Sequence, residues 1–179
     1  LPGIDVDAVI VDNEQAARHA VEHLTGLGHR RIALLTSQGL IHTNQARLAG
    51  YLQGLAAAGV TPSDELVRMA QYTREAAVRE AAIVLGLPGP ATALFTTDNL
   101  MSLGAFEGAQ RAGCVVPDEV SLVGFDDLEW TTIVRPPLTV VVSNATRPPG
   151  LSTRAISVSV CSGSGNMCSA AKQQTASKL

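Results

Sequence analysis

The chain has 179 residues and a mass of 18.6 kDa, with 46% hydrophobic residues, which suits one domain or slightly more with a sizeable core. Its formal net charge of −3 argues against a nucleic-acid-binding surface built on a basic face. No apolar run approaches the roughly 20 residues that span a bilayer, so we expect no membrane contact. The three cysteines are too few and too scattered for a disulfide framework, and no Cys or His spacing predicts a zinc site.

The chain begins at Leu1, and its first residues do not form a secretory signal, so we expect a fragment or a processed product. The alternative that a signal peptide has already been removed stays open at this point. The cysteine usage is simplest in a reducing compartment, and we predict a cytoplasmic protein.

Short apolar runs alternate with stretches of helical periodicity along the first 125 residues. Strands are predicted at residues 6–11, 31–35, 66–69, 93–95 and 120–124. Helices are predicted after the capping residues Asp12 and Asn13 and over residues 45–58, 74–85 and 100–112, and each ends at a glycine. Strands that alternate with helices of about ten to fourteen residues predict an α/β fold with a doubly wound parallel sheet.

Ligand sites of such sheets lie beyond the carboxyl ends of the strands. Polar residues gather at those predicted ends, which are Asp12 and residues 36–43, 70–72, 96–99 and 125–127. We therefore look for a binding site at this edge of the sheet.

Two acidic pairs follow predicted strands. The carboxylates of Asp126 and Asp127 suit a metal, acid and base chemistry, or ligand hydroxyls, while helix capping and solvation weigh about equally. In the pair Asp98 and Asn99 we expect one side chain to cap the following helix, which leaves the other for a ligand.

Two further side chains are candidates for a sugar-like ligand. The planar fork of Arg47 suits a carboxylate or vicinal hydroxyls, although residue type alone favours a solvent-facing arginine. Tyr72, in a predicted loop, suits stacking on a sugar ring, and partial burial in the core is an equal alternative.

Motifs for catalysis are missing from the sequence. The serines lack the Gly-x-Ser-x-Gly elbow, the four histidines show no triad context, and no phosphate-binding or dinucleotide fingerprint is present. We predict that the protein is not an enzyme and that it binds no cofactor and no metal.

Composition changes near the C-terminal end. All 16 acidic residues lie in residues 1–129, and residues 152–179 hold seven serines and two glycines without a clear period. Ile156, Val158 and Val160 alternate with serines, which permits one short strand. The rest of this segment is predicted as loop or tail.

A series of short motifs runs in a fixed order through residues 4–142. They are residues 11–13 (VDN), 20–24 (AVEHL), 27–35 (LGHRRIALL), 47–51 (RLAGY), 90–95 (PATALF), 97–105 (TDNLMSLGA), 116–127 (VPDEVSLVGFDD) and 135–139 (RPPLT). Each motif alone is weak, but the series resembles the effector-binding core of lactose-repressor (LacI/GalR-type) transcription regulators.

The resemblance implies a periplasmic-binding-protein-like fold of two α/β subdomains with a ligand cleft between them. It implies that residues 1–27 end the N-terminal subdomain and residues 28–142 form the C-terminal subdomain. Residues 143–179 do not match the family, and we predict an atypical, disordered tail there. The family's helix-turn-helix and most of its first subdomain have no counterpart in this chain.

The same resemblance assigns roles to individual residues. Arg47 matches an effector-contacting arginine, Asp98 stands where the family usually has asparagine, and Asp126 matches a ligand-facing aspartate. Tyr72 falls near an aromatic residue that stacks on ligand, and Asp12 lies on the other wall of the cleft as a weaker match.

Together these features predict the effector-binding and dimerisation region of a repressor. Its partners would be a small effector, a sugar or related polyol, and operator DNA bound through a helix-turn-helix outside this chain, with the full-length protein acting as a homodimer. The alternative is a periplasmic sugar-binding protein that feeds a transporter, and fold alone does not separate the two.

Overall fold

The computed structural model describes residues 11–38, 42–146, 155–161 and 168–169. The helices are α1 (Asn13–Gly26), α2 (His42–Ala57), α3 (Arg74–Leu85), α4 (Asn99–Arg111) and α5 (Glu129–Ile133), with a short 3-10 turn, η1, at Asp64–Leu66. The strands are β1 (Ile32–Ser37), β2 (Val67–Ala70), β3 (Ala93–Thr96), β4 (Ser121–Phe125), β5 (Thr139–Thr146), β6 (Ala155–Cys161) and β7 (Cys168–Ser169).

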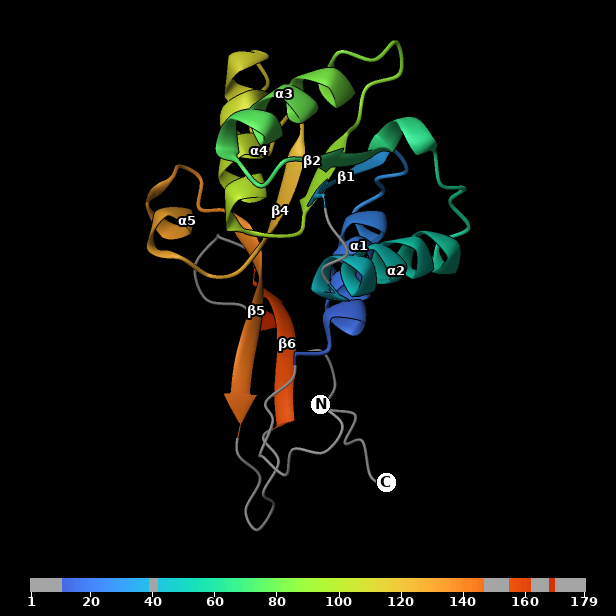
Figure 1. The fold of residues 1–179 in the computed structure, drawn as a ribbon, viewed down its shortest axis with the longest axis vertical. Helices are drawn as coiled ribbons and strands as arrows, with labels where there is room; N and C mark the ends of the chain where they lie inside the picture. The colour runs from blue at the N-terminus through green and yellow to red at the C-terminus, as the bar shows by residue number, and fades with distance from the viewer. Residues whose placement is uncertain (1–10, 39–41, 147–154, 162–167, 170–179) are drawn as a thin grey trace.

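The strands form one sheet in the order β2-β1-β3-β4-β5-β6-β7. The pairings from β2 across to β5 are parallel, and helices connect these strands, which confirms the predicted doubly wound α/β sheet (Figure 1). Beyond β5 the sheet continues with β6 and β7, which pair antiparallel. The carboxyl ends of β1, β3 and β4 therefore lie at a common edge.

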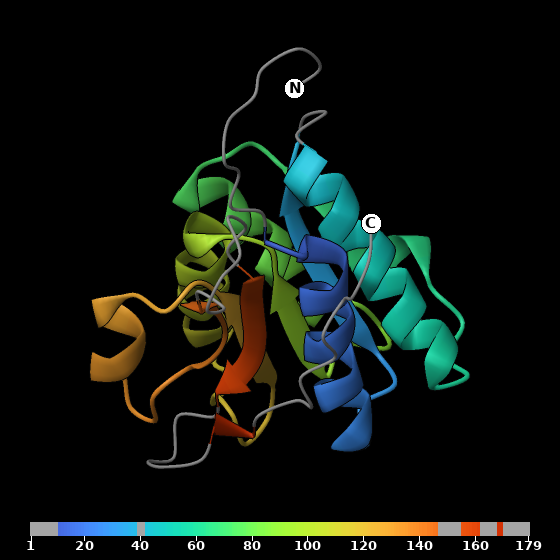
Figure 2. The same ribbon diagram turned by 90° about the horizontal axis from the view of Figure 1, so that it is seen from below.

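Helices cover both faces of the parallel strands. α1 and α2 pack on one face and α3 and α4 on the other, as Figures 1 and 2 show from two directions. In β1, Ile32 and Leu34 join the core under α1 and α2, whereas Ala33 and Leu35 join the core under α3 and α4. This alternation is the period of two expected of a strand, and because both faces are covered, all of β1 is buried.

Glycines let the paired helices approach closely. A Cβ atom on Gly54 of α2 would lie 2.7 Å from the Cβ of Val21 in α1. On the other face, a Cβ atom on Gly108 of α4 would lie 2.7 Å from the Cβ of Ala81 in α3. Real Cβ atoms do not pack at such distances. These helix pairs therefore require glycine, which has no Cβ atom, at both positions.

Most predicted elements agree with the structure. The helix predicted at residues 74–85 has the same ends as α3, and the predicted strands from residue 31 onward correspond to β1 to β4. The helix predicted at residues 45–58 begins earlier, at His42, and Asn44 within it donates to the main-chain carbonyl of Ser37 at 3.2 Å, which ties α2 to the end of β1. The strand predicted at residues 6–11 falls almost entirely outside the described residues.

The packing of α1 bears on the predicted subdomain boundary. Ala17 and Leu24 of α1 share a core with Tyr51 of α2 and Phe95 of β3. The boundary predicted at residue 27 therefore does not coincide with a break in packing. The assignment of residues 1–27 to an N-terminal subdomain stays a prediction.

The C-terminal segment contains strands within its described part. β6 covers the predicted alternation around Val158 and pairs antiparallel with β5, whose own end reaches into the segment predicted as disordered. β6 lies where the sequence permits one short strand, and the disorder predicted for the remainder of residues 143–179 stays a prediction. The other residues of this predicted tail lie outside the described residues.

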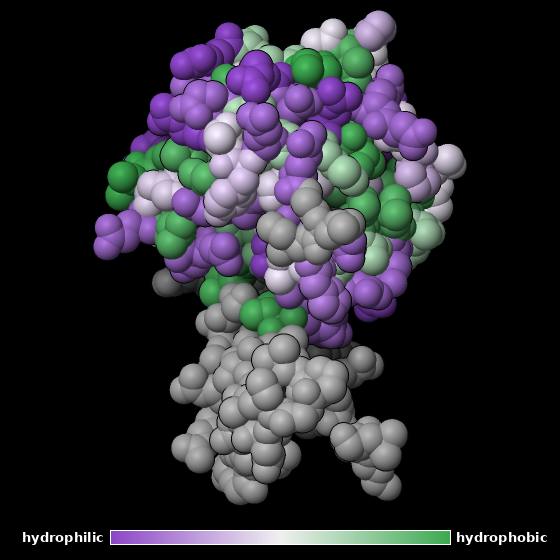
Figure 3. Space-filling view, viewed as in Figure 1, coloured by the Kyte–Doolittle hydropathy of each residue, from purple (hydrophilic) through white to green (hydrophobic). Residues whose placement is uncertain are grey.

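The surface of the molecule is mixed in character. Figure 3 shows hydrophilic residues interspersed with hydrophobic ones on the face seen in Figure 1. Within the described residues, none of the helices has both the length and the apolar composition needed to cross a bilayer.

Candidate ligand site at the carboxyl edge of the sheet

Arg47 occupies the centre of the carboxyl edge. Its Nε donates to Oδ1 of Asn13 at 2.8 Å, and its Nη1 donates to the main-chain carbonyl of Thr97. Its Cζ lies 3.6 Å from the centroid of the Phe125 ring, a cation–π contact. The start of α1, the end of β3 and the end of β4 thus hold one guanidinium, and Arg47 is not the solvent-facing arginine that its residue type alone favours.

Two carboxylates act on this guanidinium. Burial lowers the pKa of Arg47, and the nearby charges of Asp126 and Asp98 oppose that shift. Arginine keeps its charge in proteins, so the site contains a fixed cation whose charge both acids influence. The structure therefore brings together three of the residues that the sequence singled out.

Asp98 caps helix α4. Its Oδ1 accepts from the main-chain N–H of Met101 at 3.0 Å, and its Oδ2 accepts from Oγ1 of Thr97 at 3.5 Å. Burial raises the pKa of Asp98, opposed first by the Met101 hydrogen bond and then by the charge of Arg47. Since a carboxylate has about four acceptor positions, capping still leaves Asp98 able to accept from a ligand.

Asp126 and Asp127 differ in their surroundings. Asp126 has a left-handed backbone with φ of 74°, unusual for a residue other than glycine, and its N–H donates to the carbonyl of Val141 at 3.1 Å. Its side chain is exposed at the carboxyl edge. Asp127 instead accepts from Oγ1 of Thr131 in α5 at 3.3 Å, so its carboxylate stabilises the loop after β4.

The remaining predicted site residues, Asp12 and Tyr72, have no described contact with Arg47. Asp12 caps α1 by accepting from the N–H of Gln15 at 2.9 Å, and its neighbour Asn13 makes the contact with Arg47. Tyr72 follows the end of β2 and is 57% exposed, which argues against the alternative of burial in the core. Whether either residue contacts a ligand stays a prediction.

Three members of the Arg47 cluster could not be linked to Arg47 from the sequence, although Thr97 and Phe125 lie in the predicted strand ends. They are Asn13, Thr97 and Phe125, which position the guanidinium from three separate elements. A usable signal existed, because each stands directly at a predicted strand end. Their polar or aromatic character alone did not distinguish them from caps and core residues.

Three serines, which lack a nucleophile motif in the sequence, have hydrogen-bond partners in the fold. Ser37 lies 2.7 Å from the side-chain nitrogen of Asn44, Ser102 donates to the carbonyl of Asp98 at 2.8 Å, and Ser121 lies 2.9 Å from Nε2 of His29. Among the described residues no group of His, Cys, Asp and Glu is arranged to hold a metal ion.

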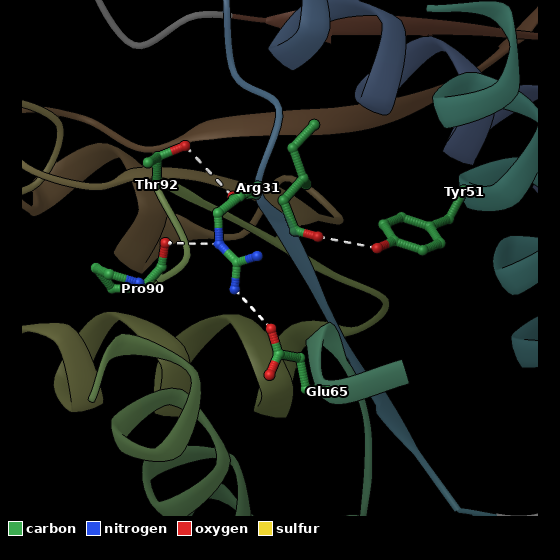
Figure 4. A network of polar contacts seen from close by, with 6 residues as sticks. Arg31, Tyr51, Glu65, Pro90 and Thr92 are labelled. Atoms are coloured by element: carbon green, nitrogen blue, oxygen red, sulfur yellow. Dashed lines mark hydrogen bonds and ion pairs between the residues drawn. The ribbon is translucent and has the colours of Figure 1, made fainter. Parts of the chain in front are cut away.

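The amino edge of the sheet is braced by polar contacts instead. Figure 4 shows Arg31 donating to Glu65 at 2.7 Å and to the carbonyl of Pro90 at 3.4 Å. The same view shows the buried hydroxyl of Tyr51, whose pKa burial raises to about 12, donating to the carbonyl of Ile32 at 2.9 Å. These contacts tie strands and helices to one another, which leaves the carboxyl edge as the candidate ligand site.

Comparison with known proteins places this geometry in a family. Residues 21–148 match the model of the periplasmic binding protein-like domain. The chain is 34% identical over 140 residues to the HTH-type transcriptional repressor CytR of Escherichia coli K12, covering 78% of this chain and 41% of that protein. A sugar-binding transcriptional regulator of the LacI family from Escherichia coli, solved with phosphate, superimposes with a TM-score of 0.72 and 26% identity, covering 83% of this chain and 60% of that one.

The chain belongs to the LacI family of transcription regulators. A further LacI-type neighbour is the transcriptional regulator CelR in complex with cellobiose, with a TM-score of 0.72, 32% identity and coverage of 79% of this chain and 43% of that one. The chain thus spans about two fifths of the curated relative, and it contains part of the LacI-family effector-binding core. The periplasmic-binding-protein-like fold predicted from the motifs is confirmed.

Proposed function

We propose that this chain senses a small polyhydroxylated molecule, a sugar or related polyol, as part of a repressor. The observation that carries the proposal is the Arg47 cluster: a partly buried guanidinium held by Asn13 and Thr97, with Asp98 and Asp126 close enough to act on its charge. A fork of donors beside carboxylate acceptors suits the alternating donors and acceptors of vicinal hydroxyls.

The mechanism would be a population shift. A ligand that binds better to one arrangement of the two subdomains favours that arrangement, and the attached DNA-binding region responds. Operator binding would use a helix-turn-helix outside this chain, and the complete regulator would act in the cytoplasm as a homodimer. The chain would carry no catalytic activity, in line with relatives that are named as regulators.

The names of the relatives support a regulator over the transporter alternative. The curated relative is a transcriptional repressor and the structural neighbours are transcriptional regulators. Two of those neighbours are named as sugar-binding or as a cellobiose complex, which supports a sugar as the effector class. A transporter-linked binding protein is therefore not favoured.

The test is substitution of Arg47 in a regulator that carries this chain together with a DNA-binding domain. Charge-assisted hydrogen bonds contribute about 1.5–3 kcal/mol, so Arg47→Ala should weaken the sugar-induced change in operator affinity by about tenfold or more. Arg79→Ala, at an exposed arginine of α3, is the matched control and should leave the dose response unchanged. An identical dose response for Arg47→Ala would remove this cluster from the effector site.

A further inference from the structure

The buried side chain of Ser102 connects the two loops that carry Asp98 and Asp126. The hydroxyl of Ser102 donates to the carbonyl of Asp98 at 2.8 Å and lies 2.7 Å from Oγ1 of Thr96. The main-chain N–H of Phe125 donates to the same hydroxyl at 3.4 Å. This contact fixes the ends of β3 and β4 relative to each other beneath the candidate site.

A second connection lies nearer the surface. Oδ1 of Asn99, the first residue of α4, accepts from Nε1 of Trp130 in α5 at 2.7 Å. Asn99 directly follows Asp98, and Trp130 lies four residues beyond Asp126. One side-chain hydrogen bond therefore joins the two acidic loops across the carboxyl edge.

The loop after β4 is held by several contacts. α5 has five residues, too short for a helix to be stable without tertiary contacts. The N–H of Asp126 donates to Val141 in β5 at 3.1 Å, and Trp130 and Val134 pack on the core under α3 and α4. Among the hydrogen bonds of the described residues, the Asn99–Trp130 bond is the one that links this loop to α4.

We propose that the Asn99–Trp130 hydrogen bond is a positioning contact that sets where Asp126 lies relative to Asp98 and Arg47. The inference rests on the proposed function for the ligand roles of those three residues. Asn99 and Trp130 act through the loop and contact no ligand themselves. The left-handed backbone of Asp126 costs conformational energy, and it persists only where the surrounding loop is held in place.

The experiment uses the full chain without any sugar. Asn99→Leu removes the acceptor, Trp130→Phe removes the donor, and Asn99→Asp keeps an acceptor oxygen in the same place. Since Trp130 is the sole tryptophan, its indole N–H gives a single NMR signal that reports the bond directly. Amide hydrogen exchange of residues 126–134 reports the position of the loop, and exchange in β1 shows whether the fold is intact.

We expect Asn99→Leu and Trp130→Phe to speed amide exchange across residues 126–134 by about tenfold or more, with exchange in β1 unchanged. Asn99→Asp should restore both the indole signal and the slow exchange. Exchange within twofold of the parent in both bond-breaking variants would overturn the proposal, as would an Asn99→Asp variant that behaves like Asn99→Leu. Because no ligand is present, these outcomes are independent of the Arg47 test of the proposed function.

Discussion

The guanidinium of Arg47 lies over the ring of Phe125, with 3.6 Å between Cζ and the ring centroid. Its Nε is bonded at the same time to Asn13, so the side chain is ordered before any ligand arrives. Long side chains lose about 0.5–1.5 kcal/mol when a ligand immobilises them. A pre-ordered Arg47 avoids that cost, which makes the carboxyl edge suited to binding rather than to a structural ion pair alone.

Asp98→Asn tests the electrostatic account of the cluster. Because burial raises the pKa of Asp98 in the folded chain, its ionised form is disfavoured by folding, and its contribution to stability falls as the pH rises through that pKa. Asparagine also caps helices well, so at pH 7 the variant should be at least as stable as the parent. Its advantage should shrink as the pH is lowered, which urea denaturation at several pH values measures.

Asp98→Ala is the matched control for that change. Alanine removes the acceptor for Met101, and loss of an N-cap costs about 0.5–2 kcal/mol. The account fails if the asparagine variant is destabilised at pH 7 as strongly as the alanine variant.

His29 should make stability depend on pH at the amino edge. Its Nδ1 lies 3.0 Å from Oγ1 of Thr92 and its Nε2 lies 2.9 Å from Oγ of Ser121, which joins three strand starts. Burial lowers the pKa of His29, and the charge of His23 lowers it further. The neutral ring is therefore favoured in the folded state, so stability is full above the ordinary histidine pKa of about 6.5 and declines as the pH falls below it.

His29→Gln should flatten this decline between pH 7 and pH 5, measured by chemical denaturation. His42→Gln, at an exposed histidine, is the matched control for the loss of a histidine side chain. His23 also has a lowered pKa because of burial, so a smaller slope should remain in the His29 variant. An unchanged slope in that variant would contradict the role of His29.

Gly108→Ala tests the close packing of α3 on α4. The new methyl group would meet Ala81 at 2.7 Å, and overpacking of this kind costs about 1–3 kcal/mol. Gly26→Ala, where a Cβ atom would meet nothing within 4 Å, is the control and should be neutral or slightly stabilising. Thermal unfolding of the two variants measures the difference. Equal destabilisation by both substitutions would contradict the packing explanation.

The regular elements could be predicted because their signals are local. The alanines and valines of α3 repeat at helical spacing, and Thr73 caps the helix at the position where the sequence offers a hydroxyl. α5 could not be predicted, because its five residues show no period and its stability depends on contacts such as Trp130 with Asn99, 31 residues away.

For the candidate site too, local features could be predicted and long-range contacts could not. Its location at the carboxyl ends of strands could be predicted from topology, and the pair Asp98 and Asn99 was expected to supply one cap, which is Asp98, and one ligand residue. The burial of Arg47 could not, because its partners Asn13 and Thr97 are 34 and 50 residues away in the chain. Its side-chain chemistry made Arg47 a candidate, but only the motif resemblance favoured it over a surface arginine.

The most direct measurement of the central claim is NMR mapping of amide shifts as a regulator that carries this chain within a complete two-subdomain effector-binding core is titrated with a panel of simple sugars. The account predicts that one or more sugars shift the amides of Asn13, Thr97, Asp98 and Asp126, and that Arg47→Ala removes those shifts. Sugar-dependent shifts confined to the amino edge around Arg31, or shifts at the carboxyl edge that persist in Arg47→Ala, would contradict it.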